Sequence, residues 1–534
     1  MKKYSLLSNY KYVMAPIVKH EKVFFAEWVL FIIVSVLVPI TGSMLSAFIV
    51  WLLGTTHPVA MIIIAITVAF LFYGMINAIQ DYIVSKGSWS RPTVRTKYFT
   101  MATVEKMMRM PLESAEDPDV ILAKEKAAQA ADGGSSAGVE PLIFASAKLL
   151  SAICGFVAYL IIIGTIHPLI MVGLLVIGII SAVISRIPNM YYMKIKDELA
   201  KEWVTINYLS RTINDSSTGK DIRAFSLSDY LIGKYDESIR RTRRYDAKHT
   251  AVKVICSIAD LILYAAADIV CYRYLINMMK NGLSITMFVF YIGIVFGISQ
   301  WIKEIADNYV SCVDSSKVIC DYREYMEHDN DRIDKNLVPD SGFEKIDIVF
   351  EHVSYKYTHS DRYVLNDVSF HIGAGEHMAL VGLNGAGKST IAKLISGLYL
   401  PTEGNIYING INTKDIDRKA YYSRISAVFQ ETLVLSYTVA ENVALSEEYN
   451  KDRVITALTK AGLMDKVNAL PYGIDTYIGQ DISEEGINLS GGERQKLLLA
   501  RALYRNPAFI IFDEPTAALD ALAESEIYEL CDER

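Results

Sequence analysis

The sequence has 534 residues, a net charge of -7 and an apolar fraction of 52%, which is high for a soluble protein. That length allows several domains, and the acidic balance argues against a nucleic-acid partner. The six cysteines form no CxxC pair and no zinc spacing, so packed, reduced thiols are expected rather than a disulfide framework or a metal site.

Six apolar segments before residue 310 are each long enough to cross a bilayer core, which needs about 20 apolar residues per helix. They are expected at 24–53, 58–84, 141–164, 168–190, 254–279 and 284–306. The start of the chain does not read as a cleaved signal peptide, because its apolar run is too long and no clear cleavage site follows. The pattern predicts a six-helix, all-α transmembrane domain over 23–310, preceded by a cytoplasmic segment over 1–22.

Lysine and arginine are distributed unevenly between the connections. Five lysines precede the first span, and the long connections after the second and fourth spans are rich in both residues. The short loops GTTHP and GTIHP contain neither. By the positive-inside rule, we expect a multi-pass protein of the plasma membrane with both chain ends in the cytoplasm.

The two long cytoplasmic connections read as helical continuations of the spans. A helical arm of about 25 residues reaches about 38 Å. The helical pattern breaks at MPLESAEDPD (110–119) and at NDSSTG (214–219). We expect these breaks to contact another domain, and the alternative is that they are simple helix–helix turns.

A few ionisable residues lie within the spans. Asp260 and Asp268 are in the fifth span and Lys148 is in the third. A charge at mid-bilayer costs about 2.5–3.5 kcal/mol on the insertion scale, so these side chains should face the bundle interior or a wet cavity. Asp268 is the best candidate for a contact with substrate, with a cation weakly indicated; the alternative is a carboxyl satisfied by a neighbouring tyrosine or serine.

The composition becomes acidic and polar at about 321–342, which marks a boundary; we expect a linker over 311–342 and an α/β P-loop ATPase domain over 343–534. The runs IDIVFEHVSYKY (346–357) and HMALVG (377–382) predict strands, and STIAKLISGL (389–398) predicts a helix.

The loop between the second of these strands and the helix has the pattern G-x-x-x-x-G-K-S, from Gly382 to Ser389. Its glycines let backbone N–H groups and the helix N-terminus point at phosphate oxygens. Lys388 would place a positive charge on the β- and γ-phosphates, and the Ser389 hydroxyl would bind Mg²⁺.

The run FIIFDEP (509–515) predicts a second buried strand that ends in two carboxylates. Asp513 is the candidate for holding Mg²⁺, and Glu514 is the candidate base that orients and activates an attacking water.

The run LSGGERQ (489–495) predicts another helix that begins with small residues and therefore offers a second anion-binding N-terminus. One nucleotide already has its phosphates held by the loop at 382–390. A second such helix end makes sense if it faces the nucleotide of another copy.

In this order, GLNGAGKST, Gln430, LSGGERQ, FIIFDEP and TAALD (516–520) resemble the nucleotide-binding domain of the ATP-binding cassette (ABC) family. With six preceding spans and two long cytoplasmic loops, nearly the whole chain resembles an exporter-type half-transporter. The resemblance implies ATP and Mg²⁺ as cofactors, with Ser389, Gln430 and Asp513 around the metal. It implies a nucleotide site made of Tyr357, Gly382, Asn384, Gly385, Ala386, Gly387, Lys388, Ser389, Thr390, Gln430, Ser490, Gly491, Gly492, Asp513 and Asp520.

The resemblance also assigns roles within this set. Tyr357 matches the aromatic residue that stacks on adenine, although it could be an ordinary strand tyrosine. Gln430 matches the glutamine that senses Mg²⁺ and the attacking water, and with Glu514 and Lys388 it completes the catalytic set. Ser490–Gly492 match the signature that contacts the γ-phosphate in trans, and Asp520 matches an acidic residue at the dimer seam.

Two further segments match contacts between the domains. Glu485–Gly486 resemble a segment that exporters press against the cytoplasmic rods, and the breaks near 113–122 and 210–220 sit where the family has coupling helices. The family also has a histidine about 30 residues after the second carboxylate motif. The sequence ends at Arg534 and its last histidine is His377, so the resemblance implies an ATPase domain that is C-terminally incomplete.

The implied function is ATP-driven export of a peptide, lipid or drug-like amphipathic compound by two half-transporters, with two ATP molecules sandwiched between them. Two alternatives share these motifs: an importer of a metal chelate on the same scaffold, and an ATP-gated channel or sensor. Because the motifs at 382–390, 489–493 and 509–515 are intact, a homodimer is mildly favoured over a heterodimer.

Overall fold

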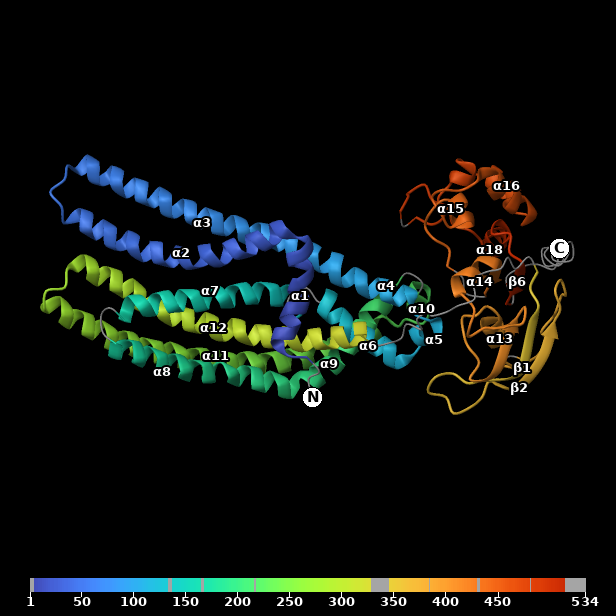
Figure 1. Cartoon of the computed structure of the whole chain (residues 1–534), viewed down its shortest axis with the longest axis horizontal. Helices are drawn as coiled ribbons and strands as arrows, with labels where there is room; N and C mark the ends of the chain where they lie inside the picture. Colours follow the sequence, from blue (N-terminus) through green and yellow to red (C-terminus); the bar gives the residue numbers. More distant parts are fainter. Residues whose placement is uncertain are drawn as a thin grey trace. The chain divides into compact units, whose positions relative to one another are not determined.

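The computed structural model describes most of the chain in eight segments. These are residues 4–132, 137–164, 168–215, 218–327, 345–383, 385–429, 433–480 and 482–513. The chain divides into two compact units (Figure 1), one made of Met1–Met108 with Leu122–His328, and the other of Arg109–Ile121 with Asp329–Arg534. The second unit therefore includes a short stretch from the middle of the helical region.

The chain from residue 6 to 327 is helical, and its long helices run side by side in Figure 1. The elements are α1 (Leu6–His20), α2 (Lys22–Leu53), α3 (Val59–Arg95), the π-helix η1 (Thr96–Thr100), α4 (Met101–Arg109), α5 (Leu112–Ala115), α6 (Pro118–Asp132), α7 (Val139–Gly164), α8 (Pro168–Ile184), α9 (Arg186–Asn214), α10 (Gly219–Ala224), α11 (Ser228–Lys280) and α12 (Ile285–Glu327). With η1, the helices α3 and α4 form a nearly continuous rod, so the expected helical continuation beyond the second span is confirmed.

Within the described residues, five helical stretches are long and apolar enough to cross a membrane. They contain the expected first, second, third, fifth and sixth spans, at Lys22–Leu53, Val59–Arg109, Val139–Gly164, Ser228–Lys280 and Ile285–Glu327. The expected fourth span falls in the shorter α8 and the start of α9. Apolar side chains on the outer faces are exposed, such as Ile64 at 63% and Leu71 at 69%, as expected for surfaces that face lipid.

The expected linker at 311–342 is wrong in its first part, because α12 continues as a helix to Glu327. The segment is polar, so it lacks the apolar run that marked the span before it. Pairs spaced three and four residues apart, Lys317–Asp314 and Arg323–Glu327, support the helix there. Residues 328–342 lie outside the described residues.

Close packing of α7 on α12 forms the centre of the first unit. Tyr159 and Trp301 meet edge to face with their ring centroids 6.1 Å apart. A Cβ atom at Gly155 would come within 2.5 Å of the Trp301 side chain, and one at Gly297 would come within 2.4 Å of Tyr159. Small residues thus let the two helices approach, as is typical where lipid supplies no hydrophobic driving force.

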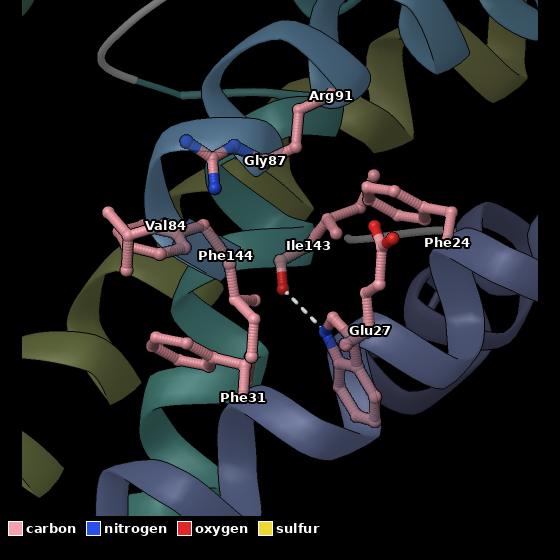
Figure 2. A pocket seen from close by; sticks show the side chains of 11 residues that line it. Phe24, Glu27, Phe31, Val84, Gly87, Arg91, Ile143 and Phe144 are labelled. Atoms are coloured by element: carbon pink, nitrogen blue, oxygen red, sulfur yellow. Dashed lines mark hydrogen bonds between the residues drawn. The ribbon is translucent and has the colours of Figure 1, made fainter. Parts of the chain in front are cut away.

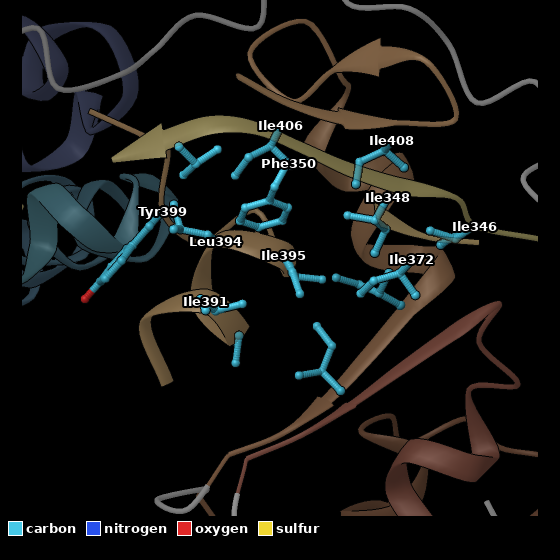
Figure 3. Packing of buried hydrophobic residues seen from close by; sticks show 14 of the residues in the cluster. Ile346, Ile348, Phe350, Ile372, Ile391, Leu394, Ile395, Tyr399, Ile406 and Ile408 are labelled. Atoms are coloured by element: carbon cyan, nitrogen blue, oxygen red, sulfur yellow. The ribbon is translucent and has the colours of Figure 1, made fainter. Parts of the chain in front are cut away.

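Among its described residues, the second unit contains two sheets. A four-stranded antiparallel sheet has the order β2 (Leu365–Ile372), β1 (Ile348–Tyr355), β3 (Glu403–Ile408) and β4 (Ile411–Asn412), and a two-stranded parallel sheet joins β5 (Ile425–Val428) to β6 (Phe509–Phe512). Figure 3 shows the apolar side chains of β1, β2 and β3 gathered with those of helix α13 (Lys388–Ile395). Phe350, Leu394 and Ile406 are fully buried there, so this core fixes the position of α13.

A helical region follows in the same unit. It contains α14 (Arg418–Arg424), α15 (Val439–Ala444), α16 (Lys451–Lys460), α17 (Met464–Asn468), the 3-10 helix η3 (Gly473–Asp475) and α18 (Gly491–Tyr504). One face of α18 is buried against α15 and α16 through Leu497 and Ala500. The strand expected at 346–357 and the helices expected at 389–398 and 489–495 are confirmed in type, as is the strand expected at 509–515 over its described part, Phe509–Phe512.

The expected strand HMALVG (377–382) is wrong. The structure assigns no strand between Ile372 and the phosphate loop, and Val381 and Leu383 are 95% and 87% exposed. A short apolar run becomes a strand only if an open sheet edge accepts its backbone hydrogen bonds. Among the described residues, 377–382 forms no hydrogen-bonded pairing with a strand. The hydrophobic pattern of a segment does not show whether a partner strand is available.

Candidate functional site

The phosphate loop turns sharply through two glycines with positive φ, Gly385 at 82° and Gly387 at 89°. A side chain at Gly387 would also come within 2.7 Å of Leu365. Only glycine adopts this backbone without strain, and the turn lets α13 begin at Lys388 with its first N–H groups free of intrahelical partners. Such a helix start attracts anions.

Lys388 folds back over its own loop. Its Nζ donates to the Gly382 carbonyl at 2.9 Å and to the Leu383 carbonyl at 3.4 Å. These contacts hold the ammonium beside the backbone that forms the cradle. A phosphate bound in the loop would lie next to this charge.

The structure brings together two of the candidate metal ligands, although they are 124 residues apart in sequence. The Ser389 hydroxyl donates to Asp513 Oδ1 at 3.1 Å, and Asp513 directly follows β6. A hydroxyl and a carboxylate side by side are oxygen donors suited to Mg²⁺. The donor set therefore fits the expected ion.

Tyr357 lies in the loop after β1 and is 38% exposed as a residue. Its hydroxyl is 3.1 Å from Thr390 Oγ1, and Thr390 is buried in α13. The ring meets Tyr355 and Tyr399 edge to face, at centroid distances of 5.3 Å and 5.9 Å. A half-exposed ring fixed beside the phosphate loop is suited to stacking on a base.

The first helical break, at 110–119, contacts the ATPase core within the second unit. Leu112 packs against the cluster of β1 and α13. Tyr399 is buried, its hydroxyl donates to the Glu116 carboxylate, and Lys393 Nζ lies 2.9 Å from that hydroxyl and 3.5 Å from the same carboxylate. Burial raises the pKa of the Tyr399 phenol, and the hydrogen bond to Glu116 raises it further, so the phenol stays a donor.

The same break makes a second polar contact. His359 Nε2 lies 3.3 Å from Asp117 and 3.3 Å from Asp119. The expected contact of this break with another domain is confirmed. Sequence reasoning missed its partners His359, Lys393 and Tyr399, for which no local motif exists.

For the second break, residues 216–217 lie outside the described residues. The neighbouring helix α10 belongs to the first unit. The contact of this break with another domain therefore stays a prediction.

The signature segment forms the start of α18. Ser490 caps the helix by accepting from the Glu493 N–H at 3.3 Å, and Glu493 in turn accepts from the Ser490 N–H at 2.9 Å. This bond from Ser490 lowers the pKa of the Glu493 carboxyl, which Lys466 also pairs at 3.1 Å. The N–H groups of Gly491 and Gly492 remain at the open helix end.

The signature and the phosphate loop of this chain do not meet. Ser490 and Gly491 are exposed, and among the described residues no hydrogen bond or ion pair joins Ser490–Gly492 to 382–390. The start of α18 is thus exposed within the described part of the chain, and its role as an anion site facing a partner stays a prediction.

A buried asparagine, which sequence reasoning missed, organises the loop at 433–438. Asn442 exchanges hydrogen bonds with the Leu435 backbone at 2.9 Å in both directions. Arg501 of α18 bonds the carbonyls of Asn442 at 2.8 Å and Leu433 at 2.9 Å. This network connects α18 to the chain that follows the position of Gln430.

Four of the predicted site residues lie outside the described residues: Asn384, Gln430, Glu514 and Asp520. Their roles remain predictions. Glu485–Gly486 is described, and Gly486 forms a tight turn by donating to the Ser483 carbonyl at 3.1 Å, but its expected contact with the rods stays a prediction.

The intramembrane carboxylates are half-buried in α11. One oxygen of Asp260 and one of Asp268 are buried without a hydrogen-bond partner within the described chain. Asp268 neighbours Ala267 and Cys271, which belong to the buried cluster around Trp301. The Asp260 carboxyl has a hydrogen bond with Ser181, as the alternative of a carboxyl satisfied by serine expects, whereas no such partner is found for Asp268 among the described residues. Substrate contact stays a prediction.

Comparisons with known proteins agree with this architecture. The ABC transporter family model matches residues 365–517. The subtilin transport ATP-binding protein SpaT of Bacillus subtilis is 25% identical over 530 residues, covering 95% of this chain and 83% of that protein. The ATP-dependent lipid A-core flippase of Yersinia pestis bv. Antiqua (strain Antiqua) is 41% identical over 191 residues, covering 35% of this chain and 32% of that protein.

A solved structure of a bacterial Atm1-family ABC exporter with ATP bound superposes with a TM-score of 0.75 at 19% identity. The superposition covers 94% of this chain and 88% of that one. At this identity the likeness shows a shared fold, which includes both the helical and the ATPase parts.

Proposed function

We propose that this chain, which belongs to the ABC transporter family as a half-transporter with an exporter-type membrane domain fused to an ABC ATPase domain, exports a peptide, lipid or drug-like amphipathic compound. ATP hydrolysis coupled to export is the general activity. The names of two relatives, one for subtilin transport and one for flipping of lipid A-core, support an amphipathic substrate class.

The observation that carries the mechanism is the separation of the two anion sites within one chain. The phosphate loop begins α13, and the open start of α18 makes no contact with it among the described residues. Two copies arranged head to tail would place Gly491 and Gly492 of each opposite the phosphate loop of the other. ATP bound there favours the closed pair because it gains contacts from both copies, which shifts the equilibrium between open and closed states.

Within each composite site the chain's own groups have distinct roles. Lys388 would neutralise phosphate charge, Ser389 and Asp513 would hold Mg²⁺, and Tyr357 would stack on the adenine ring. Glu514 takes a proton from the attacking water, and Gln430 positions that water. Bound Mg²⁺ supplies positive charge that stabilises the phosphoryl group during transfer.

We place the ATPase unit and both chain ends in the cytoplasm, with the bundle in the plasma membrane. Support comes from the Lys- and Arg-rich long connections and the short loops without these residues. The partner is a second half-transporter, and a second copy of this chain is preferred because no motif is degenerate.

The test uses two half-transporters with different tags, purified as pairs, and counts ATP that remains bound after gel filtration. A pair of Lys388→Ala in one copy and Gly491→Asp in the other leaves one composite site intact, so it should retain about one nucleotide. A pair of wild type with a copy carrying both substitutions has no intact composite site and should retain none.

A site formed within a single chain reverses this outcome. The double variant paired with wild type would then retain nucleotide and the other pair would retain none, which would refute the proposed arrangement. Transport into inside-out vesicles upon addition of ATP tests the direction of export.

The contact of Glu116 with Tyr399 and Lys393 predicts a coupling defect. Glu116→Gln replaces the charged carboxylate, which accepts the hydrogen bond from Tyr399, with a neutral amide. Hydrogen bonds to charged groups contribute about 1.5–3 kcal/mol. We expect ATP affinity to stay unchanged, while the ATP-induced shift between open and closed membrane units falls about tenfold or more in its equilibrium constant. Spin labels at Lys280 on two paired copies would report this shift by their distance distribution.

Glu125→Gln is the matched control, because Glu125 lies on the exposed side of α6. It should preserve the ATP-induced distance change. A Glu116→Gln protein that opens and closes as wild type does would show that this contact does not transmit the movement.

A further inference from the structure

A pocket opens between α2, α3 and α7 in the first unit (Figure 2). Its empty volume of about 380 Å³ includes the open solvent at its mouth, so it is a shallow groove and not an enclosed cavity. It lies where α2 begins, α3 approaches its end and α7 begins. The positive-inside pattern assigns this end of the helices to the boundary between bilayer and cytoplasm.

The pocket wall is apolar and aromatic. Phe24, Phe31, Ile83 and Phe144 line it, and the Trp28 indole N–H is already satisfied by the Ile143 carbonyl at 3.0 Å. The wall therefore offers a surface for methylene groups and few free polar groups. Aromatic rings at this level are typical of the membrane interface.

Two cations contact the Phe144 ring. The Arg91 guanidinium lies 4.4 Å from the ring centroid and Lys148 Nζ lies 4.6 Å from it. Within the described chain, neither forms an ion pair within 4 Å; Lys148 interacts electrostatically with Glu304. Two positive charges at one ring repel each other, so an anion placed between or beside them would be stabilised.

The acidic side chains close to the pocket are occupied by other partners. Glu27 lines the wall and is paired with Lys86, and Glu140 is paired with Arg95 at 2.8 Å. The charges of these pairs offset each other. Arg91 and Lys148 make no ion pair of their own, although Glu140 acts electrostatically on Arg91 and Glu304 on Lys148, so part of their charge remains at the mouth.

Gly87 gives Arg91 its position. A Cβ atom at Gly87 would come within 3.0 Å of an Arg91 guanidinium nitrogen, so the guanidinium rests over the bare backbone one turn earlier. Figure 2 shows this side chain reaching back over Gly87 toward Phe144. A larger residue at 87 would move the charge without removing it.

We infer that this pocket binds an anionic glycerophospholipid of the adjoining leaflet. The phosphate would lie on Arg91 and Lys148, and the first methylenes of an acyl chain would lie against Phe24 and Val84, which line the groove and are partly exposed. A soluble phosphate would use only the two cations, whereas a lipid uses the apolar wall as well. Such a lipid would bridge three helices of the bundle, at residues that include neither the predicted nucleotide-site residues nor Asp268.

Native mass spectrometry of the complete protein in detergent would test this, with dioleoyl-phosphatidylglycerol, dioleoyl-phosphatidylcholine and inorganic phosphate as separate titrants. Each cation near a membrane surface contributes about fivefold to binding of an anionic lipid, so we expect about 25-fold preference for phosphatidylglycerol over phosphatidylcholine. Arg91→Gln and Lys148→Gln should each lower that preference about fivefold. Lys11→Gln, which removes one exposed charge on α1, should leave it unchanged.

Gly87→Val keeps every charge and provides a second variant should Arg91→Gln fail to fold; it should also lower the preference. Equal binding of the two lipids would overturn the proposal, as would an Arg91→Gln or Gly87→Val protein with the wild-type preference. Displacement of phosphatidylglycerol by millimolar inorganic phosphate would show a site for soluble anions and would also overturn it.

Discussion

Replacing Lys388 with alanine is expected to weaken ATP binding by at least about 30-fold. Lys388 Nζ sits over the phosphate loop, 2.9 Å from the Gly382 carbonyl, where its charge would meet the bound phosphates. Truncating one partner of a hydrogen-bonded charge pair costs about 2–5 kcal/mol, which corresponds to this factor or more. Titration with a fluorescent ATP analogue, in the complete protein, measures the change.

Lys460→Ala serves as the control for this experiment. It removes the same charge from an exposed position at the end of α16 in the same unit. Its affinity for ATP should equal that of the wild type. An unchanged dissociation constant for Lys388→Ala would contradict the assignment of the phosphate loop.

The Glu514→Gln protein is expected to bind ATP normally and to hydrolyse it about 10²- to 10⁴-fold more slowly, the usual contribution of a general base. Glutamine keeps the shape of the side chain but does not accept the proton of the attacking water. Because hydrolysis resets the pair, the closed dimer should accumulate with ATP. Steady-state phosphate release and size-exclusion chromatography with ATP measure the two effects.

Glu447→Gln makes the same charge change at an exposed position before α16 and should leave turnover unchanged. Rapid turnover by Glu514→Gln would refute its role as base. If the Glu514→Gln protein hydrolysed ATP slowly but formed no stable dimer with ATP, the result would show that hydrolysis is not the step that reopens the pair.

The type of most elements could be predicted from the sequence because their signals are local. An apolar run long enough for a bilayer, a glycine loop before a helix and a serine three residues before a glutamate each specify structure within a few residues. Helix α12 shows the limit: its polar extension to Glu327 depends on side-chain pairs and on contacts such as that of Asn9 with Ser316, which is 307 residues away in sequence.

The candidate site was predictable where motifs are contiguous and less so where the fold joins distant residues. The phosphate loop and the N-cap of α18 are each specified by a contiguous sequence motif. The hydrogen bond of Ser389 to Asp513 needed the fold but was anticipated from their shared metal chemistry. The contact of Tyr399 with Glu116 spans 283 residues. The sequence marks the break that holds Glu116 as a contact segment, but Tyr399 belongs to no motif, so only the structure reveals the pair.

Helix α11 runs for 53 residues without interruption, which corresponds to about 80 Å. A continuous helix of that length, with its backbone hydrogen bonds intact, does not bend sharply when one end is displaced. A tilt of about 5° at one tip therefore displaces the opposite tip by about 7 Å, more than the pitch of one helical turn. Ångström-scale rearrangements at one tip thus suffice to part or join side chains at the other, and no intervening hinge is required.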